Sequence, residues 1–275
     1  MNKVVLVGAG GKMGCRLTDN LIGTDYEVAY LEVSDVGIER MKERQVEPSQ
    51  PEDVIPLADW VIFAVPDVAI QKVTEQLVPM MKPAAAGVTL DPAAPLAGHL
   101  YPRADIHYFA THPSHPSVFN WEPSKEAHYD YFGGIAAKQA IVCALIQGPE
   151  EIYADGERLA KTIYAPVTVS HRITIEQMGI LEPALSETFG AAVISVLKEG
   201  VDRVVELGVP KAAAYDFFLG HINIELALLF GQLEGGQFSD AALKAIELGK
   251  PLIFKDNWKD VFEPENVIKQ VKAIT

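Results

Sequence analysis

Two histidines in the segment "ATHPSHPSVFN" (residues 110–120) could carry acid–base or metal chemistry. His112 and His115 each stand directly before a proline. Proline fixes its own φ and pushes the preceding residue toward an extended conformation, so neither histidine sits comfortably in a helix. Imidazole suits both proton transfer near neutral pH and metal ligation. We expect the prolines to hold the two rings in an extended segment, with His112 the favoured functional group. The alternative is that the His-Pro steps only shape a loop.

Acidic residues in the second half of the chain could join these histidines. Glu187 stands among small and apolar residues in "GILEPALSETFGAA", where a carboxylate is costly unless it is paired or bound to a metal. His221 and Glu225 stand four residues apart in an apolar helix-like stretch, which puts both on one face. The predicted metal set is therefore His112, Glu187, His221 and Glu225. A hydrogen bond that only joins two helices would explain the second pair equally well. Glu182 is a weaker candidate, because the proline beside it suggests a helix start, where an acid is favoured anyway.

A glycine loop near the N-terminus predicts a dinucleotide site. "GAGGKMG" follows the apolar strand "KVVLV" and precedes a helix-like stretch. Glycines allow the backbone to approach a diphosphate at a helix N-terminus. Glu32 ends the second strand, where a carboxylate can accept hydrogen bonds from an adenosine ribose and would repel a 2′-phosphate. We therefore expect NAD rather than NADP; the alternative is a tight turn that binds nothing. The loop residues expected to contact the cofactor are Gly8, Gly10, Gly11, Lys12, Met13 and Gly14.

The ends of two later strands should face the same crevice. "FAVPD" supplies Val65, Pro66 and Asp67, and Gln71 stands one turn along the next helix. "LDPAA" ends the following strand, and ligands collect at the carboxyl ends of parallel strands. Asp91 in that segment is assigned a structural role more readily than a chemical one. We predict that Val65, Pro66, Asp67 and Gln71 contact the cofactor.

The pattern of apolar runs predicts an α/β fold with two domains. Over residues 1–149, short apolar runs alternate with helix-like stretches, which is typical of a doubly wound parallel sheet of the Rossmann type. From Glu150 onward helical spacing dominates. One long helical stretch is expected from about Thr174 to Glu206, with irregularities at Pro183 and Gly190, and another helix over roughly 210–231. The prediction is an N-terminal Rossmann domain over 1–149, followed by an all-α C-terminal domain over 150–275.

Composition restricts the partners. The chain has 275 residues, of which 49% are apolar, and a formal charge of −14, which repels a phosphate backbone and argues against nucleic acid. The N-terminus is not a signal peptide, and no apolar run approaches a membrane span. Cys15 and Cys143 show no metal spacing and are expected to be reduced thiols of a cytoplasmic protein. The stretch "AAAYDFFLGHINIELALLF" is apolar over most of its circumference, so we expect a homodimer through the helical domain.

Several segments resemble known proteins. "GAGGKMG", "FAVPD" and the helical second half resemble the 6-phosphogluconate dehydrogenase-like superfamily. Within it, "ATHPSHPSVFN", "FGGIAAKQAIVCALIQG" and "GILEPALSETFGAA" resemble the D-apionate oxidoisomerase family, which comprises bacterial NAD enzymes of branched sugar-acid catabolism. The resemblance spans nearly the whole chain. Its specific parts are the double His-Pro segment and the Glu-Pro helix, since the glycine loop is generic.

This resemblance implies a two-stage reaction. The 2-hydroxyl group of D-apionate would be oxidised by NAD, and a hydroxymethyl group would then migrate to the new carbonyl carbon, giving 3-oxo-isoapionate. His112, His115 and Glu187 are the expected catalytic residues, with His112 as the base that takes the hydroxyl proton. The shift develops charge on two adjacent oxygens, which a divalent cation (Mg²⁺, Mn²⁺ or Zn²⁺) would stabilise.

Three alternatives remain open. A simple NAD-dependent hydroxyacid dehydrogenase would oxidise without a carbon shift, but such relatives carry a lysine on the first long helix of the second domain, and this stretch has none before Lys198. A prephenate dehydrogenase-like enzyme is suggested by "THP" after a strand. A non-catalytic NAD sensor would need the glycine loop but neither His112 nor Glu187.

Overall fold

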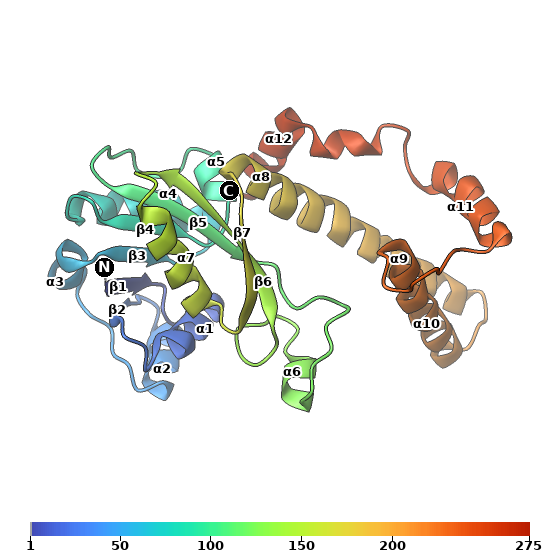
Figure 1. Ribbon diagram of the computed structural model, residues 1–275, viewed down its shortest axis with the longest axis horizontal. Coiled ribbons are helices and arrows are strands. Elements are labelled where there is room, and N and C mark those ends of the chain that lie inside the picture. Colours follow the sequence, from blue (N-terminus) through green and yellow to red (C-terminus); the bar gives the residue numbers. More distant parts are fainter. Residues whose placement is uncertain (1) are drawn as a thin grey trace. The chain divides into compact units, whose positions relative to one another are not determined.

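A seven-stranded sheet forms the centre of the α/β part of the chain (Figure 1). The computed structural model describes residues 2–275. The strands lie in the order β2-β1-β3-β4-β5-β6-β7. Their bounds are β1 (Lys3–Val7), β2 (Glu27–Leu31), β3 (Trp60–Phe63), β4 (Ala86–Thr89), β5 (His107–Pro113), β6 (Gln139–Gln147) and β7 (Val167–Arg172).

The strand order creates a crevice beside β1. β2 pairs with one edge of β1 and β3 pairs with the other edge, and both pairings are parallel. A reversal of this kind opens a ligand crevice at the carboxyl ends of the strands. The doubly wound sheet expected from the sequence is therefore confirmed.

One strand departs from the parallel pattern. β6 pairs antiparallel with β5, whereas β7 pairs parallel with β6. A parallel pairing needs a crossover, usually through a helix. The connection between β5 and β6 contains only α6 (Lys125–Tyr129), a helix of 5 residues. The sequence prediction of an all-parallel sheet is wrong at this strand.

Helices cover both faces of the sheet. On one face, α1 (Lys12–Leu21) and α7 (Ile152–Ile163) pack over a core that includes Leu17, Trp60 and Phe109, each at most 1% exposed. On the other, α4 (Asp67–Leu77) and α5 (Ala93–Leu96) pack over a second core around Phe63 and Ile70. Because both faces are buried, the strands consist of nearly continuous apolar runs. The smaller elements of this part are α2 (Asp35–Glu43), α3 (Pro51–Val54) and the 3₁₀ turns Ile55–Leu57 and Val78–Met80.

The chain forms two compact units. We call the first the sheet unit, which runs to Pro183 and includes Val267–Thr275; the second, the helical unit, is Ala184–Asn266. The sheet unit continues beyond residue 149, because α7 and β7 pack on the sheet. The predicted boundary after residue 149 thus marks a change in sequence pattern, whereas packing with the sheet continues to Pro183.

The helical stretch predicted from Thr174 to Glu206 is irregular at Pro183 and Gly190, as expected. It consists of α8 (Ile175–Gly179), a π-helix (Ile180–Ala191) and α9 (Ala192–Glu206). Pro183 lies inside the π-helix, where its missing N–H and its ring oppose regular α-helical hydrogen bonding. The helix predicted over 210–231 is confirmed as α10 (Lys211–Leu229). The remaining elements are α11 (Asp240–Ile253), the 3₁₀ helix Trp258–Phe262 and α12 (Pro264–Ile274).

Two helical stretches are, by length and composition only, long and apolar enough to cross a membrane. They are Ile175–Glu206 and Lys211–Leu229, with mean hydropathies of 1.4 and 1.2 over their most apolar windows. The prediction that no apolar run approaches a membrane span does not cover these helices, because a few polar residues interrupt their apolar runs. Length and composition alone are weak evidence, since a buried core helix of a soluble protein can be as long and as apolar.

Candidate active site

The glycine loop is packed so closely that side chains have no room. Gly8 has a φ of +80°, which favours glycine, and a Cβ there would lie 2.5 Å from the Ala64 carbonyl oxygen. A Cβ on Gly14 would lie 2.0 Å from the Gly8 oxygen, and one on Gly10 would lie 2.2 Å from the Gly37 oxygen. The loop is therefore held tightly between β3, α1 and α2. Gly11, the N-cap of α1, provides no side-chain cap, which leaves the first N–H groups of this helix available to an anion.

Glu32 ties the second strand to this loop. One carboxylate oxygen, Oε2, accepts a hydrogen bond from the Gly10 N–H at 3.0 Å, and Oε1 accepts from the N–H groups of Val33 and Ser34 at 2.8 and 2.9 Å. Partial burial alone would raise the pKa of Glu32, but the hydrogen bonds from Ser34, Val33 and Gly10 hold it below its ordinary value. An ionised carboxylate is thus fixed beside the loop. Its contact with a ribose stays a prediction.

A cavity of about 400 Å³ opens between the loop and the ends of β3 and β4. Of the residues predicted to contact the cofactor, Gly11, Lys12, Met13, Val65, Pro66 and Asp67 line it. Asp91 and His112 line the same cavity, and the volume is within the range of small-molecule sites. Gln71 is instead exposed on α4, where its side-chain amide donates to Glu75 at 3.2 Å. Its cofactor role remains a prediction without support from the shape of this cavity.

His112 presents a defined tautomer to the cavity. Its Nδ1 lies 2.7 Å from the Leu90 carbonyl oxygen, which can only accept, so Nδ1 carries the proton and Nε2 keeps a lone pair. Burial, reinforced by the neighbouring His115, lowers the pKa of His112 to about 4, although the bond to Leu90 acts in the opposite direction. The ring is therefore neutral at neutral pH. It is available as a metal ligand or as a hydrogen-bond acceptor.

His115 shows the same tautomer but a different backbone from the one predicted. Its Nδ1 lies 2.8 Å from the Phe132 carbonyl oxygen, so its Nε2 is also unprotonated in the neutral ring. The centroids of the His112 and His115 rings lie 6.3 Å apart. His112 is in β5, which confirms the extended prediction, but His115 has a φ of +59°, in the left-handed region. The extended prediction is wrong for His115, because a tertiary hydrogen bond to Phe132 outweighs the local preference of a residue before proline.

Two acids complete a cluster with His112. Asp91 accepts a hydrogen bond from the Ala93 N–H at 2.7 Å through Oδ1, and its Oδ2 lies 3.9 Å from His112 Nδ1. Asp91, His112 and Glu182 each offer one ligand atom, and these three atoms lie within 4.8 Å of one another. Two oxygen donors and one imidazole nitrogen form a donor set that suits a divalent cation. The pKa of Asp67, in the same cavity, is raised to about 6 by burial and by the charge of Asp91.

Of this cluster, only His112 is predicted as a metal ligand from the sequence. The sequence favours a structural role for Asp91 and a helix-start role for Glu182. The usable signal for Glu182 was its place in the Glu-Pro segment that carried the family resemblance. Glu182 lies in the π-helix, and π-helical turns are frequent at functional sites.

The other predicted residues belong to the helical unit. Glu187 is exposed in the π-helix. His221 lies on α10, where its Nδ1 is 2.7 Å from the Phe217 carbonyl oxygen and its ring stacks on Phe217 at 4.1 Å. Glu225 follows one turn later on the same helix. The metal and catalytic roles of Glu187, His221 and Glu225 stay predictions.

Together, the crevice at the sheet reversal, the glycine loop and the helical second part define a Rossmann-type, dinucleotide-dependent oxidoreductase. Comparison with known proteins agrees. Residues 120–275 match the family model described as phosphogluconate dehydrogenase (decarboxylating) C-term. A D-apionate oxidoisomerase from Cupriavidus necator is 50% identical over 99% of each chain, and one from Rhizobium rhizogenes is 49% identical over 100% of each. The chain belongs to the D-apionate oxidoisomerase family.

A solved structure supports the same fold over the full length. It is described as a semialdehyde dehydrogenase NAD-binding protein from Cupriavidus necator in complex with calcium and NAD. The two chains superpose with a TM-score of 0.98 at 50% identity, and the match covers 100% of each. The sheet, the loop and the helical part are therefore shared by a protein that has been observed with a dinucleotide.

Proposed function

We propose that this protein oxidises D-apionate with NAD and rearranges the product to 3-oxo-isoapionate. The observation that carries the proposal is the cluster of Asp91, His112 and Glu182, of which Asp91 and His112 line a cavity that the glycine loop also lines. A simple hydroxyacid dehydrogenase needs a hydride acceptor and a base. A hydroxymethyl shift additionally needs charge stabilisation at two neighbouring oxygens, and an acid–imidazole cluster that can hold a cation supports that step.

NAD, when bound, supplies the hydride acceptor for carbon 2 of the substrate. The N–H groups at the start of α1 would hold the diphosphate, and Glu32 would accept hydrogen bonds from the adenosine ribose. The carboxylate of Glu32 would disfavour the additional phosphate of NADP. The preference for NAD thus rests on one charged side chain and on the loop backbone beside it.

Asp91, His112 and Glu182 would hold a divalent cation. A cation would supply Lewis acidity to the two oxygens between which charge develops. His112 would bind it through Nε2, since Nδ1 carries the proton donated to Leu90. Mg²⁺, Mn²⁺ and Zn²⁺ all accept such donors. Glu187, His221 and Glu225, the other members of the set predicted from sequence, are not needed for this cluster.

With one lone pair, His112 cannot ligate a cation and accept a proton through the same nitrogen. We therefore assign the hydroxyl proton to Nε2 of His115, the second imidazole, whose Nδ1–H donates to Phe132. As hydride leaves carbon 2, His115 would take the proton of the 2-hydroxyl group, leaving a carbonyl. His112 then binds the cation and His115 accepts the proton, so both histidines of the double His-Pro segment have a role.

The second stage moves one carbon–carbon bond. The bond from carbon 3 to its hydroxymethyl carbon breaks, and its electron pair forms the new bond to carbon 2. The tertiary hydroxyl on carbon 3 loses a proton and becomes the new carbonyl, while the former carbonyl oxygen on carbon 2 takes up a proton. No further redox change occurs, so one NAD is reduced per substrate converted.

The test is the product of the purified protein with D-apionate, NAD and a divalent metal. We expect NADH formation at a one-to-one ratio with a rearranged product, identified by carbon NMR. An unrearranged 2-oxo acid would favour the simple dehydrogenase instead. Bound NAD without turnover of any sugar acid or aromatic acid offered would favour a sensor.

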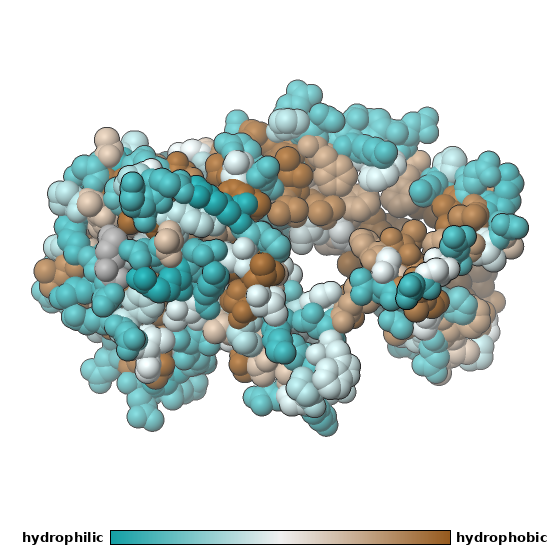
Figure 2. All heavy atoms as spheres, in the orientation of Figure 1, coloured by the Kyte–Doolittle hydropathy of each residue, from teal (hydrophilic) through white to brown (hydrophobic). Residues whose placement is uncertain are grey.

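We further propose that two copies associate through α9 and α10. Figure 2 shows apolar side chains gathered on the surface of the helical part of the chain. The most apolar window of α10 is only 6% buried, and exposed apolar patches of this kind are typical of interfaces. A monomer in light scattering at micromolar concentration would contradict the homodimer. Exposed apolar residues on these helices include Ile194, Val196, Val204, Phe217, Leu219, Ile224 and Leu229.

A further inference from the structure

The segment 130–137, which we call the carboxylate-centred loop, folds around the side chain of Asp130. Its Oδ2 accepts hydrogen bonds from the N–H groups of Ile135, Ala136 and Ala137 at 3.1, 3.0 and 3.2 Å. The side chain is only 5% exposed. Burial would raise the pKa of Asp130, but these hydrogen bonds and the charge of Arg16 lower it overall. An ionised carboxylate therefore fixes the shape of this loop.

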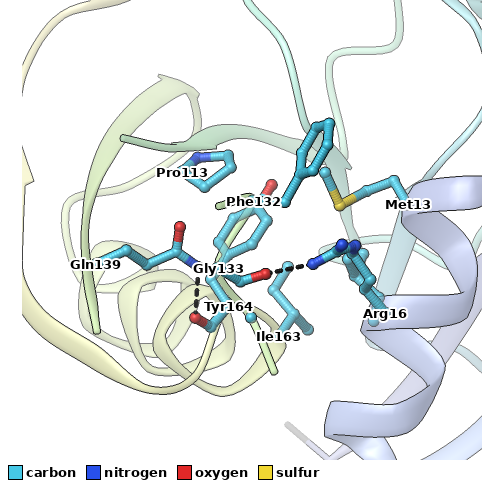
Figure 3. A pocket seen from close by; sticks show the side chains of 10 residues that line it. Met13, Arg16, Pro113, Phe132, Gly133, Gln139, Ile163 and Tyr164 are labelled. Carbon is cyan, nitrogen blue, oxygen red and sulfur yellow. Dashed lines mark hydrogen bonds between the residues drawn. The ribbon is translucent and has the colours of Figure 1, made fainter. Parts of the chain in front are cut away.

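Helix α1 holds the carboxylate-centred loop in place through Arg16. Its Nη1 lies 3.5 Å from Asp130 Oδ1 and 2.5 Å from the Gly133 carbonyl oxygen, to which it donates. The guanidinium carbon lies 5.1 Å from the centroid of the Phe132 ring (Figure 3). Asn20, one turn later, donates to the Gly134 carbonyl at 3.1 Å. The loop is thus attached to the helix that begins at the dinucleotide loop.

The contact between α1 and this loop is tightly packed. The cavity between them measures about 10 Å³ and is lined by Met13, Arg16, Phe132, Gln139 and Tyr164, among others (Figure 3). Such a volume accommodates about one water molecule. Little space is therefore left between these residues on this side, although Phe132 as a whole is 63% exposed.

Phe132 connects this attachment to the second histidine. Its carbonyl accepts the Nδ1–H of His115 at 2.8 Å, and the two rings meet edge to face at 5.7 Å. His115 in turn lies 6.3 Å from the His112 ring. The left-handed backbone of His115 is strained for a residue with a side chain, and it persists only where the surroundings hold it. An unbroken series of contacts runs from Arg16 through Phe132 and His115 to His112.

We propose that Arg16 and Asp130 are positioning residues for His115. They hold the Phe132 carbonyl where it fixes both the tautomer and the place of the second imidazole. The inference rests on the proposed function only in giving His115 the role of proton acceptor. The positioning itself is independent of the substrate.

The first experiment reads the tautomer of His115 without any substrate. The protein is labelled with ¹⁵N at histidine, and the ring signal of His115 is assigned with His115→Ala. In the wild type with NAD bound we expect a protonated Nδ1 and an unprotonated Nε2. In Arg16→Met and in Asp130→Asn we expect the Nδ1 and Nε2 chemical shifts of His115 to approach a common value, because the ring then exchanges between its two neutral tautomers. Unchanged shifts in both variants would overturn the proposal.

Controls separate positioning from general damage. Arg158→Met removes an arginine that pairs with Asp155 at 2.9 Å on α7, away from the carboxylate-centred loop, and should leave the His115 signals unchanged. If Arg16→Met does not fold, the tautomer of His115 is measured in Asp130→Asn, which keeps the volume of the side chain, and in Arg16→Lys, which keeps the charge. NAD affinity should stay within about twofold in all variants that fold, because the glycine loop is retained. A uniform loss of NAD binding would mean that the pair only supports α1.

The second experiment is a double-mutant cycle on turnover of D-apionate. We expect His115→Ala to lower kcat by about 100-fold and Arg16→Met by about tenfold. The double variant should be no slower than His115→Ala, because Arg16 acts through His115. Additive losses would overturn the proposal, whereas an unaffected His115→Ala would refute the role of His115 as proton acceptor in the proposed function. A wild type that does not turn over D-apionate refutes the proposed function instead, and the tautomer measurement then still decides the positioning.

Discussion

Replacement of Glu32 by glutamine tests how the chain recognises its dinucleotide. Glu32 accepts hydrogen bonds through both oxygens: Oε2 from Gly10, and Oε1 from Val33 and from the N–H and hydroxyl of Ser34. Glutamine keeps the size of the side chain but has a single acceptor oxygen. If that oxygen serves Ser34 and Val33, the amide group faces the Gly10 N–H, and two donors oppose each other at about the former 3.0 Å separation.

The magnitude follows from the bonds that are lost. A partly buried donor left without an acceptor costs about 1–3 kcal/mol, and a hydrogen bond to a charged acceptor is worth about 1.5–3 kcal/mol. We therefore expect Glu32→Gln to be less stable by about 1–3 kcal/mol and to bind NAD roughly 10- to 100-fold more weakly. NADP should lose less affinity or gain some, because the repulsion of its 2′-phosphate is removed. The ratio of the two affinities should then fall.

The assay is a titration of NADH and NADPH fluorescence on the wild type, Glu32→Gln and Glu27→Gln. Glu27 is a matched control at the start of β2, where its carboxylate is 73% exposed and pairs with Lys3. An unchanged ratio of NADH to NADPH affinity in Glu32→Gln would refute the ribose role. Tighter binding of NADPH than of NADH by the wild type would refute the NAD preference itself.

Replacement of Glu32 by glutamine should also change how the stability of the chain depends on pH. In the folded chain the pKa of Glu32 lies below its ordinary value of 4.5, so the unfolded chain binds the proton more readily. The contribution of Glu32 is therefore complete above that value and is lost as the pH falls through the folded pKa. In Glu32→Gln, the loss of thermal stability on acidification should be shallower over this range than in the wild type.

Three further predictions concern the loop, the cluster and the core. Gly14→Ala should abolish measurable NAD binding and lower the melting temperature, because its Cβ would lie 2.0 Å from the Gly8 carbonyl oxygen; a normal NAD titration would contradict this packing. Glu182→Gln or exhaustive chelation should lower turnover by at least about 100-fold and weaken Mn²⁺ binding measured by calorimetry, with NAD affinity retained; full turnover after chelation would exclude a metal role. Phe109→Ala, at a side chain 1% exposed between Trp60 and Tyr153, should destabilise the chain by about 3–5 kcal/mol in urea unfolding, and a loss below about 1 kcal/mol would mean that the core collapses around the gap.

Local sequence determined the elements of the α/β part and the loop that defines its class. The apolar runs at Lys3–Val7 and Trp60–Phe63 became buried strands because a strand covered on both faces needs continuous apolar residues. Ser239 accepts the Ala242 N–H at 3.2 Å as the N-cap of α11. These features depend on neighbours a few residues away, so their signals are present in short windows of sequence.

Tertiary structure alone decided which side chains meet. Asp91, His112 and Glu182 come from three separate parts of the chain, and no spacing relates them; they converge because the sheet order brings the end of β4 beside β5 and the packing of the sheet unit adds Glu182. His115 adopts a left-handed backbone because Phe132, 17 residues away, supplies the hydrogen bond that holds it. Periodicity encodes how a segment folds locally, whereas the position of a functional group depends on long-range contacts whose energy only the assembled chain contains.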